Sequence, residues 1–201
     1  GQIDPATAGD YYHQVLDQVF TLQKDRGLDL AQLDEATWQD LVNQVLTQVG
    51  QQDQFQVFNQ SPRFQAIRRQ MQGRMHTFGH FLLRQAQQSP FQVLHTEVTF
   101  GGPRGQGLQG FTYPLASKGH LTIRGKIDRI DRLVHQDQAY LQVIDYKSGQ
   151  KNFNLVDAYY GLDLQVLTYL AVAHQHYPDH RLVGGFYQPI LYKYETGKDL
   201  D

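Results

Sequence analysis

Two aspartates and a lysine interrupt otherwise apolar, strand-forming sequence in the second half of this chain. Asp128 lies in GKIDRID, and Asp145 lies in LQVIDYKSG, where Lys147 follows it two residues later. Charged side chains are seldom placed inside apolar strands unless they are paired or have a function. Because side chains alternate between the two faces of a strand, Lys147 is expected to project from the same face as Asp145. These residues are therefore the first candidates for chemistry.

The two segments are predicted to pair as a β-hairpin. If Gln136 and Asp137 form a two-residue turn, Asp128 lies directly across from Asp145, whereas a register that differs by one residue would offset them. Directly opposed side chains have Cβ atoms about 4.5–5.5 Å apart. Two carboxylates at that separation repel each other unless a cation lies between them. Mg²⁺ fits because it takes oxygen ligands and needs only one or two carboxylates besides water and phosphate; Mn²⁺ is the alternative ion.

Lys147 would complete such a site. A cationic side chain beside the metal can hold the attacking water or neutralise charge that develops on a phosphate, so the arrangement suits phosphodiester hydrolysis. The structural alternative is a hairpin stabilised by a cross-strand salt bridge, with Asp131 or Arg129 on its outer side.

The composition is that of a chain that can bury a core. Of the 201 residues, 40% are hydrophobic, and no stretch approaches the ~18 consecutive apolar residues of a membrane span. The absence of cysteine excludes disulfides and thiolate metal sites within this segment. No secretion signal opens the sequence, so we expect a cytoplasmic protein. The first residue, Gly1, is not methionine, which indicates a piece of a longer polypeptide.

Residues 1–90 are predicted to form a helical lobe. Apolar residues recur at helical spacing from Asp10 to Arg26, from the N-cap Asp34 to Gly50, and from the N-cap Ser61 to the Ser89-Pro90 pair. His13 lies beside the apolar stripe of the first helix, where a histidine is more often structural than a metal ligand.

Residues 91–201 are predicted to form the core that carries the site, and the two parts together are expected to make one compact domain. Strands are expected over residues 91–101, 120–134, 139–147 and 181–194, with a helix over residues 156–177 that ends before Pro178. This order predicts a mixed α/β or α+β domain. The glycine-rich loop GGPRGQG does not match the phosphate-binding pattern GxxxxGK[ST], so ATP hydrolysis is not supported within this chain.

Charge is unevenly distributed along the helical lobe. Residues 1–60 are strongly acidic, whereas residues 61–90 contain arginines and no acid. Such segregation fits a face that follows a DNA backbone, and equally fits a solvated helix packed against an acidic neighbour. The arginines proposed to contact the backbone are Arg63, Arg68, Arg69 and Arg74.

Three blocks in the core, GKIDRID, VIDYKSG and GLDLQVLTYL, resemble in order and spacing the RecB-type nuclease motifs of the PD-(D/E)xK superfamily. With AGDYYHQVLDQVF near the start and GGFYQPI near the end, the chain resembles the C-terminal nuclease domain of AddB/RexB subunits of bacterial helicase–nucleases. The resemblance implies a restriction-endonuclease-like core, with a central mixed sheet flanked by helices and an N-terminal helical lobe. It also implies magnesium-dependent exonuclease action on DNA during end resection in double-strand break repair by homologous recombination, beside an AddA/RexA partner.

The resemblance also assigns roles to residues. It implies the metal ligands His13, Asp128, Asp145 and the carbonyl of Tyr146, the catalytic residues Asp128, Asp145 and Lys147, and the site-shaping or DNA-binding residues Gln165 and Tyr169. Many AddB proteins hold an iron–sulfur cluster through cysteines that flank this core, and the segment does not support one.

Other histidines and acids give weaker signals. His76 and His80 have the HxxxH spacing of a metal site but lack the glutamate of HExxH, and Glu97 is a candidate to approach the site from the first strand. The rival functions are a catalytically silent DNA-binding or scaffold domain of the same assembly, and an endonuclease directed at RNA or at particular DNA structures.

Overall fold

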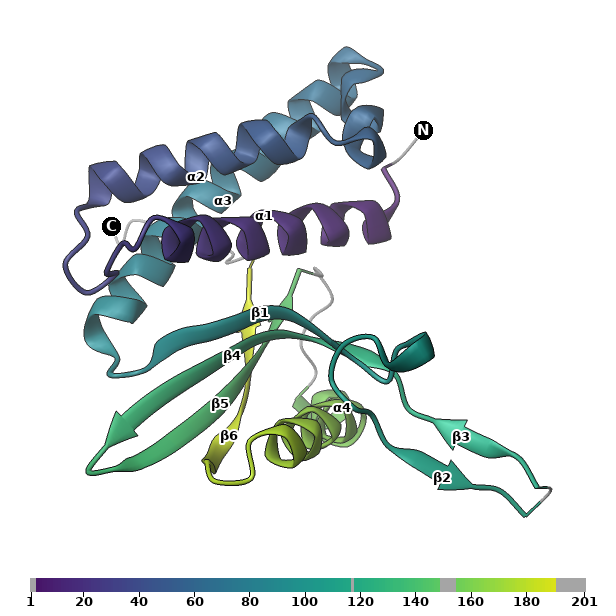
Figure 1. Ribbon diagram of the computed structural model, residues 1–201. Helices are drawn as coiled ribbons and strands as arrows, with labels where there is room; N and C mark the ends of the chain where they lie inside the picture. Colours follow the sequence, from purple (N-terminus) through teal and green to yellow (C-terminus); the bar gives the residue numbers. More distant parts are fainter. Residues whose placement is uncertain (1–2, 117, 149–154, 191–201) are drawn as a thin grey trace, which may run out of the picture.

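Three helices precede a β-sheet that carries a fourth helix on its other face (Figure 1). The computed structural model describes residues 3–116, 118–148 and 155–190, and for residues 155–164 it describes the backbone alone. The helices are α1 (Pro5–Asp25), α2 (Glu35–Gly50), α3 (Pro62–Gln88) and α4 (Leu155–His176), with the 3-10 turns η1 (Asp53–Asn59) and η2 (Pro103–Gly105). The strands are β1 (Gln92–Phe100), β2 (Thr112–Pro114), β3 (His120–Thr122), β4 (Gly125–His135), β5 (Gln138–Lys147) and β6 (Arg181–Pro189).

The predicted helices of the lobe are confirmed, together with two of their caps. The Asp34 carboxylate accepts a hydrogen bond from the Thr37 N–H, and the Ser61 hydroxyl accepts one from the Phe64 N–H. These side chains satisfy backbone donors that a first helical turn leaves without partners. The first helix begins at Pro5, earlier than the predicted Asp10, because proline is well suited to the first helical position.

The core of the lobe is aromatic and aliphatic. Trp38 is fully buried and donates its indole N–H to the Gly79 carbonyl at 2.7 Å, which joins α2 to α3. The turn η1, which the sequence pattern did not predict, adds Phe55 and Phe58 to this core, where both pack edge-on against Tyr11. The apolar face of α1 is thereby closed on the side away from the sheet.

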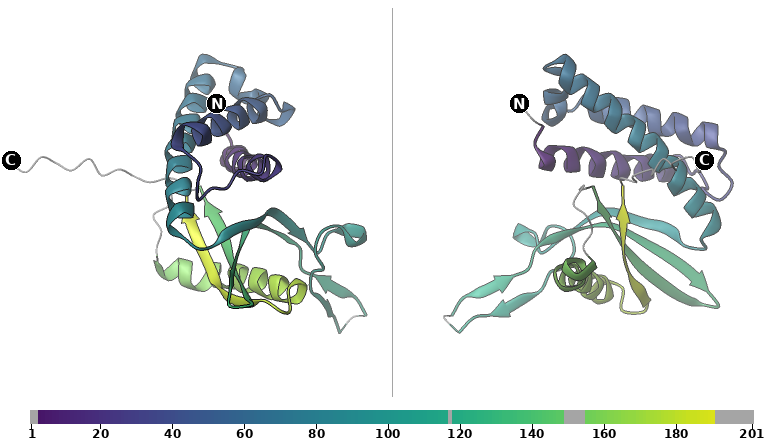
Figure 2. Two further views of the ribbon diagram at one scale, coloured as in Figure 1. Left: turned by 60° about the vertical axis from the view of Figure 1, so that its left-hand side comes forward. Right: turned by 180° about the vertical axis from the view of Figure 1, so that it is seen from behind.

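The sheet has the order β1-β4-β5-β6, and it is mixed because only the β5–β6 pair is parallel. The helical lobe covers one face and α4 covers the other (Figure 2). Ile144 and Tyr146 face the core of the lobe, whereas Val143 belongs to a second core with Val172 and Ala173 of α4. The predicted fold class, a mixed α/β chain with an N-terminal helical region, is confirmed. Within the described residues, no helix has the length and apolar character needed to cross a bilayer.

One predicted strand, residues 120–134, is wrong, since the structure divides it. β3 ends at Thr122 and pairs with β2, which was not predicted, while β4 begins at Gly125 and joins the main sheet. The break lies at a crowded point: a Cβ on Gly125 would lie 2.5 Å from the Phe100 ring. The last predicted strand, residues 181–194, is confirmed as β6 to Pro189, and its remainder lies largely outside the described residues.

Candidate active site

The predicted hairpin register is confirmed by the pairing of β4 with β5. The paired residues run from His135 and Gln138 to Arg129 and Ile144. Both turn residues, 136 and 137, have positive φ angles, as a type I′ turn requires. Asp128 and Asp145 follow the last of these pairs on the two strands, and their carboxyl groups lie close enough to shift each other's pKa.

Asp128 is held from two further directions. Its Oδ2 lies 3.3 Å from His13 Nε2 and accepts a hydrogen bond of 2.7 Å from the Tyr146 N–H. The other ring nitrogen of His13, Nδ1, donates to the Gly9 carbonyl at 2.8 Å. Although burial by itself lowers the pKa of His13, the hydrogen bond and charge of Asp128 raise that pKa to about 9. Helix α1 therefore delivers a cationic imidazole to the buried carboxylate.

Their surroundings shift the pKa values of the two aspartates in opposite directions. Burial raises the pKa of Asp145, and the nearby charge of Asp128 adds to this shift, whereas the Lys147 ammonium group opposes it. Burial also disfavours ionisation of Asp128, but the hydrogen bond and charge of His13 lower its pKa below the usual range. Two carboxyl groups that shift each other's pKa in this way cannot both ionise freely. A cation placed between them would relieve this conflict.

Lys147 projects from the face predicted for it. Its Nζ lies 2.6 Å from Asp145 Oδ2, although the approach is off the direction of a good hydrogen bond, so this buried oxygen has charge compensation without a directed donor. Lys147 Nζ also donates to Gln165 Oε1 at 3.4 Å, and Gln165 donates to the Tyr169 hydroxyl at 2.6 Å. Helix α4 thus positions Lys147 through the hydrogen bond to Gln165, which Tyr169 holds in place.

The predicted salt-bridge alternative for this hairpin is wrong. Among the described residues, no ion pair joins β4 to β5: Lys147 pairs with Asp145 within β5, and Arg129 pairs with Asp131 within β4. Arg129 and Asp131 are buried, whereas this alternative placed one of them on the outer side.

A third carboxylate borders the pair from β1. The paired residues on either side place Glu97 next to Asp128 across the β1–β4 ladder, and Glu97 has a positive φ of 50°. Burial raises the pKa of Glu97 against the opposing effect of its ion pair with Lys126. Sequence reasoning missed Lys126, for which the only signal was its position two residues before Asp128 on the same strand.

The types of ligand atom in this site fit a hard divalent cation, although they do not form a complete coordination sphere. Among the described residues, no three His, Asp or Glu side chains already surround a common point. Asp145 Oδ2, however, is a buried carboxylate oxygen that lacks a directed hydrogen bond, which is the kind of atom that Mg²⁺ or Mn²⁺ binds. A histidine whose Nδ1 donates to a backbone carbonyl presents Nε2 as a metal ligand once that nitrogen loses its proton.

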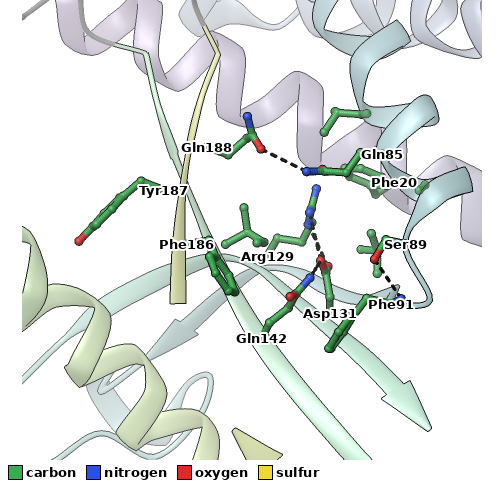
Figure 3. Close-up of a pocket in the computed structure, with 14 residues that line it drawn as sticks. Phe20, Gln85, Ser89, Phe91, Arg129, Asp131, Gln142, Phe186, Tyr187 and Gln188 are labelled. Atoms are coloured by element: carbon green, nitrogen blue, oxygen red, sulfur yellow. Dashed lines mark hydrogen bonds and ion pairs between the residues drawn. The ribbon is translucent and has the colours of Figure 1, made fainter. Parts of the chain in front are cut away.

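The opposite face of the hairpin supports the site. Arg129 makes two contacts to the Asp131 carboxylate, at 2.9 and 3.0 Å, and donates to the Tyr146 hydroxyl at 2.9 Å. Its guanidinium also lies 5.5 Å from the centre of the Phe20 ring. This group borders a cavity of about 380 Å³ between the helical lobe and the sheet (Figure 3). Because the Tyr146 N–H holds Asp128, the cluster fixes the backbone between Asp145 and Lys147.

Other predicted residues lie apart from this arrangement. Arg63, Arg68, Arg69 and Arg74 lie on α3, where Arg68 donates to Asn59. His76 and His80 contact Gln39 and Glu35 of α2, so their described partners do not include the aspartates. For Tyr146, the described side-chain and N–H contacts are those of its N–H, its hydroxyl and its ring, and the role of its carbonyl stays a prediction.

Comparison with known proteins identifies a family and its relatives. The family described as the PD-(D/E)XK nuclease superfamily matches residues 1–196. Similar proteins include an ATP-dependent helicase/deoxyribonuclease subunit from Latilactobacillus sakei, 39% identical over 84% of this chain and 14% of that protein. The protein of the same name from Enterococcus faecalis is 40% identical over 85% of this chain and 14% of its own length, and that from Lacticaseibacillus casei is 31% identical over 100% and 18%. The chain therefore spans less than a fifth of the length of these relatives.

Proposed function

Because this chain belongs to the PD-(D/E)XK nuclease superfamily, we propose that it is a metal-dependent deoxyribonuclease domain that hydrolyses phosphodiester bonds. One observation carries the proposal. Asp128 and Asp145 meet on neighbouring strands, with His13 at one carboxylate and Lys147 at the other. The residues come from α1, β4 and β5, so the helical lobe must pack on the sheet to assemble them.

Each described side chain has a distinct task in this proposal. Asp128, Asp145 and His13 Nε2 would hold Mg²⁺ or Mn²⁺. When bound, the ion supplies positive charge that stabilises the phosphate as it is attacked. Lys147 turns its ammonium group from Asp145 toward the scissile phosphate, where it offsets developing negative charge and orients the water. Gln165 limits the positions open to that ammonium group.

The relatives suggest the biological setting. They are named as subunits of an ATP-dependent helicase/deoxyribonuclease, and the proposed setting is the AddB/RexB subunit of such an assembly. In this setting the domain acts as an exonuclease on DNA in the cytoplasm, during end resection before homologous recombination. An AddA/RexA subunit supplies the partner helicase–nuclease.

The test is DNA cleavage by the complete protein with its partner subunit, measured separately on each strand of an end-labelled duplex. Lys147→Ala and Asp145→Ala are expected to abolish cleavage of one strand. Arg132→Ala, an exposed residue at the far end of β4, is the control and should leave cleavage unchanged. If both strands are degraded at the wild-type rate in Lys147→Ala and Asp145→Ala, the domain is catalytically silent and serves as a DNA-binding or scaffold element.

A further inference from the structure

The β2–β3 ribbon, residues 111–116 and 118–124, extends away from the sheet beyond both the lobe and α4 (Figures 1 and 2). Thr112 pairs with Thr122, Tyr113 with Leu121 and Pro114 with His120, and all six residues are exposed. A two-stranded ribbon is marginal by itself in water, so its projection from the sheet calls for an explanation.

The base of the ribbon is fixed. Ile123 N–H donates to the Phe111 carbonyl at 2.9 Å, and both side chains pack against the core beneath α4. Gly101 has a φ of +65° and passes so close to Ile123 that a Cβ would lie 2.2 Å from its carbonyl oxygen. Only glycine accommodates both the angle and this approach. The ribbon is therefore held at its base on the same core as the sheet.

The ribbon and its flanking loop are uniformly basic. No aspartate or glutamate occurs from residue 101 to residue 127. Arg104, Lys118 and Arg124 are exposed, and none of them forms an ion pair with an acid in the described part of the chain. Lys126, in contrast, is paired with Glu97. Three uncompensated cations on a projecting element attract a polyanion.

One face of the ribbon is apolar and aromatic. Beyond the anchored Phe111, the same face presents Tyr113 and Leu121 opposite each other, 50% and 53% exposed, and then Leu115 near the tip. The Tyr113 ring lies 6.5 Å from the Phe111 ring in a tilted arrangement. An exposed aromatic ring on an element that also carries unpaired cations is the combination that binds single-stranded nucleic acid, because bases stack on the ring and phosphates approach the charges.

The ribbon leads directly into the candidate active site. Arg124 at its base is four residues before Asp128, roughly 13 Å along an extended strand. Lys126, whose ammonium group pairs with Glu97, lies between them on the chain. A strand that followed the cations of the ribbon would therefore arrive at the paired aspartates.

We propose that the β2–β3 ribbon binds single-stranded DNA and guides it to the aspartate pair, with Tyr113 as a base-stacking surface and Lys118 and Arg124 as phosphate contacts. This inference rests on the proposed nuclease function for its substrate. A DNA strand is favoured over a protein partner because the charge is entirely of one sign and the element ends at the site.

The test measures binding of a labelled oligothymidine to the complete protein at several salt concentrations, in an Asp145→Asn background that should prevent cleavage. Lys118→Ala with Arg124→Ala is expected to weaken binding at least tenfold and to reduce the slope of log K against log salt by about 1.4, since each contact with a single strand contributes about 0.7. Tyr113→Ala is expected to weaken binding about tenfold with little change in the slope.

Two matched controls come from the far end of the β4–β5 hairpin. Arg132→Ala removes an exposed arginine and Val134→Ala an exposed apolar residue, and both should bind like the parent protein. Ribbon variants that bind with the affinity and salt slope of these controls would overturn the inference. So would ribbon variants that release the partner subunit while their DNA affinity is unchanged.

Cleavage by the same ribbon variants with Asp145 restored separates the two proposals. If Lys147→Ala abolishes cleavage while the ribbon variants match the controls in binding and in kcat/KM, the nuclease proposal stands and the ribbon inference fails. If the ribbon variants lose affinity and salt slope while Lys147→Ala cleaves normally, the ribbon binds DNA and the nuclease proposal fails.

Discussion

Replacing Arg129 by methionine is expected to lower the free energy of unfolding by about 3 kcal/mol. Arg129 is 5% exposed and Asp131 is 3% exposed, so the substitution leaves a buried carboxylate without its cationic partner. Breaking a buried ion pair in this way costs about 3–5 kcal/mol. The lower end applies here because Gln142 still donates to Asp131 at 3.0 Å.

The double variant Arg129→Met with Asp131→Leu distinguishes the stability lost with the ion pair from the cost of leaving one buried charge unpaired. If Asp131→Leu is added to Arg129→Met, no buried charge remains at this position, and most of the lost stability should return, since apolar replacements of a buried pair are often nearly neutral. The measurement is urea unfolding of the chain, followed by the fluorescence of Trp38, its single tryptophan. Arg26→Met, at an exposed arginine, is the control and should change stability by less than about 0.5 kcal/mol.

Two outcomes would contradict a buried ion pair that stabilises the fold through its charges. If Arg129→Met is no more destabilising than Arg26→Met, the cluster does not hold the sheet against the lobe. If the double variant loses as much as or more than the single variant, the cost arises from packing against Phe20 and Tyr146 and not from an uncompensated charge.

Two further predictions concern the packing of α4 and the cap of α2. Gly185→Ala should destabilise the chain by about 1–3 kcal/mol in thermal unfolding, because the added Cβ would lie 2.1 Å from Val166 Cγ1. Gly184→Ala is the control and should be nearly neutral, since its Cβ would make only an ordinary contact. Adding Val166→Ala to Gly185→Ala should recover part of the lost stability. The hydrogen bonds from the Thr37 N–H and hydroxyl lower the pKa of Asp34, so its charge stabilises the fold above about pH 4 and that contribution is lost as the pH falls through the depressed pKa. Asp34→Asn keeps the cap without the charge, so its deficit in urea unfolding should be largest at neutral pH and shrink below about pH 4; a deficit that is constant with pH would contradict this.

The sequence predicts the local features of this fold well. The helices of the lobe follow from apolar periodicity and from the caps at Asp34 and Ser61, and the β4–β5 register follows from a two-residue turn between strands of fixed alternation. Each of these depends on residues that are neighbours in the chain, so the pattern contains the information.

The site and the ribbon depend on contacts that no local pattern encodes. His13 and Asp128 are 115 residues apart, and only the resemblance to a family connected them. Arg129 and Asp131 read as surface charges, and their burial requires the lobe to cover this face of the sheet. The break before Gly125 was missed because it depends on the distant Phe100 ring and not on a local turn signal.

The central claim is that Asp128 and Asp145 act together on one divalent cation, and calorimetric titration of the chain with Mn²⁺ tests it most directly. We expect one ion to bind to the wild-type chain, and Asp128→Asn and Asp145→Asn each to reduce that affinity at least tenfold. His80→Ala, a histidine paired with Glu35 on the lobe, should bind the ion as the wild type does. Binding that is equally strong in both aspartate variants would contradict the account.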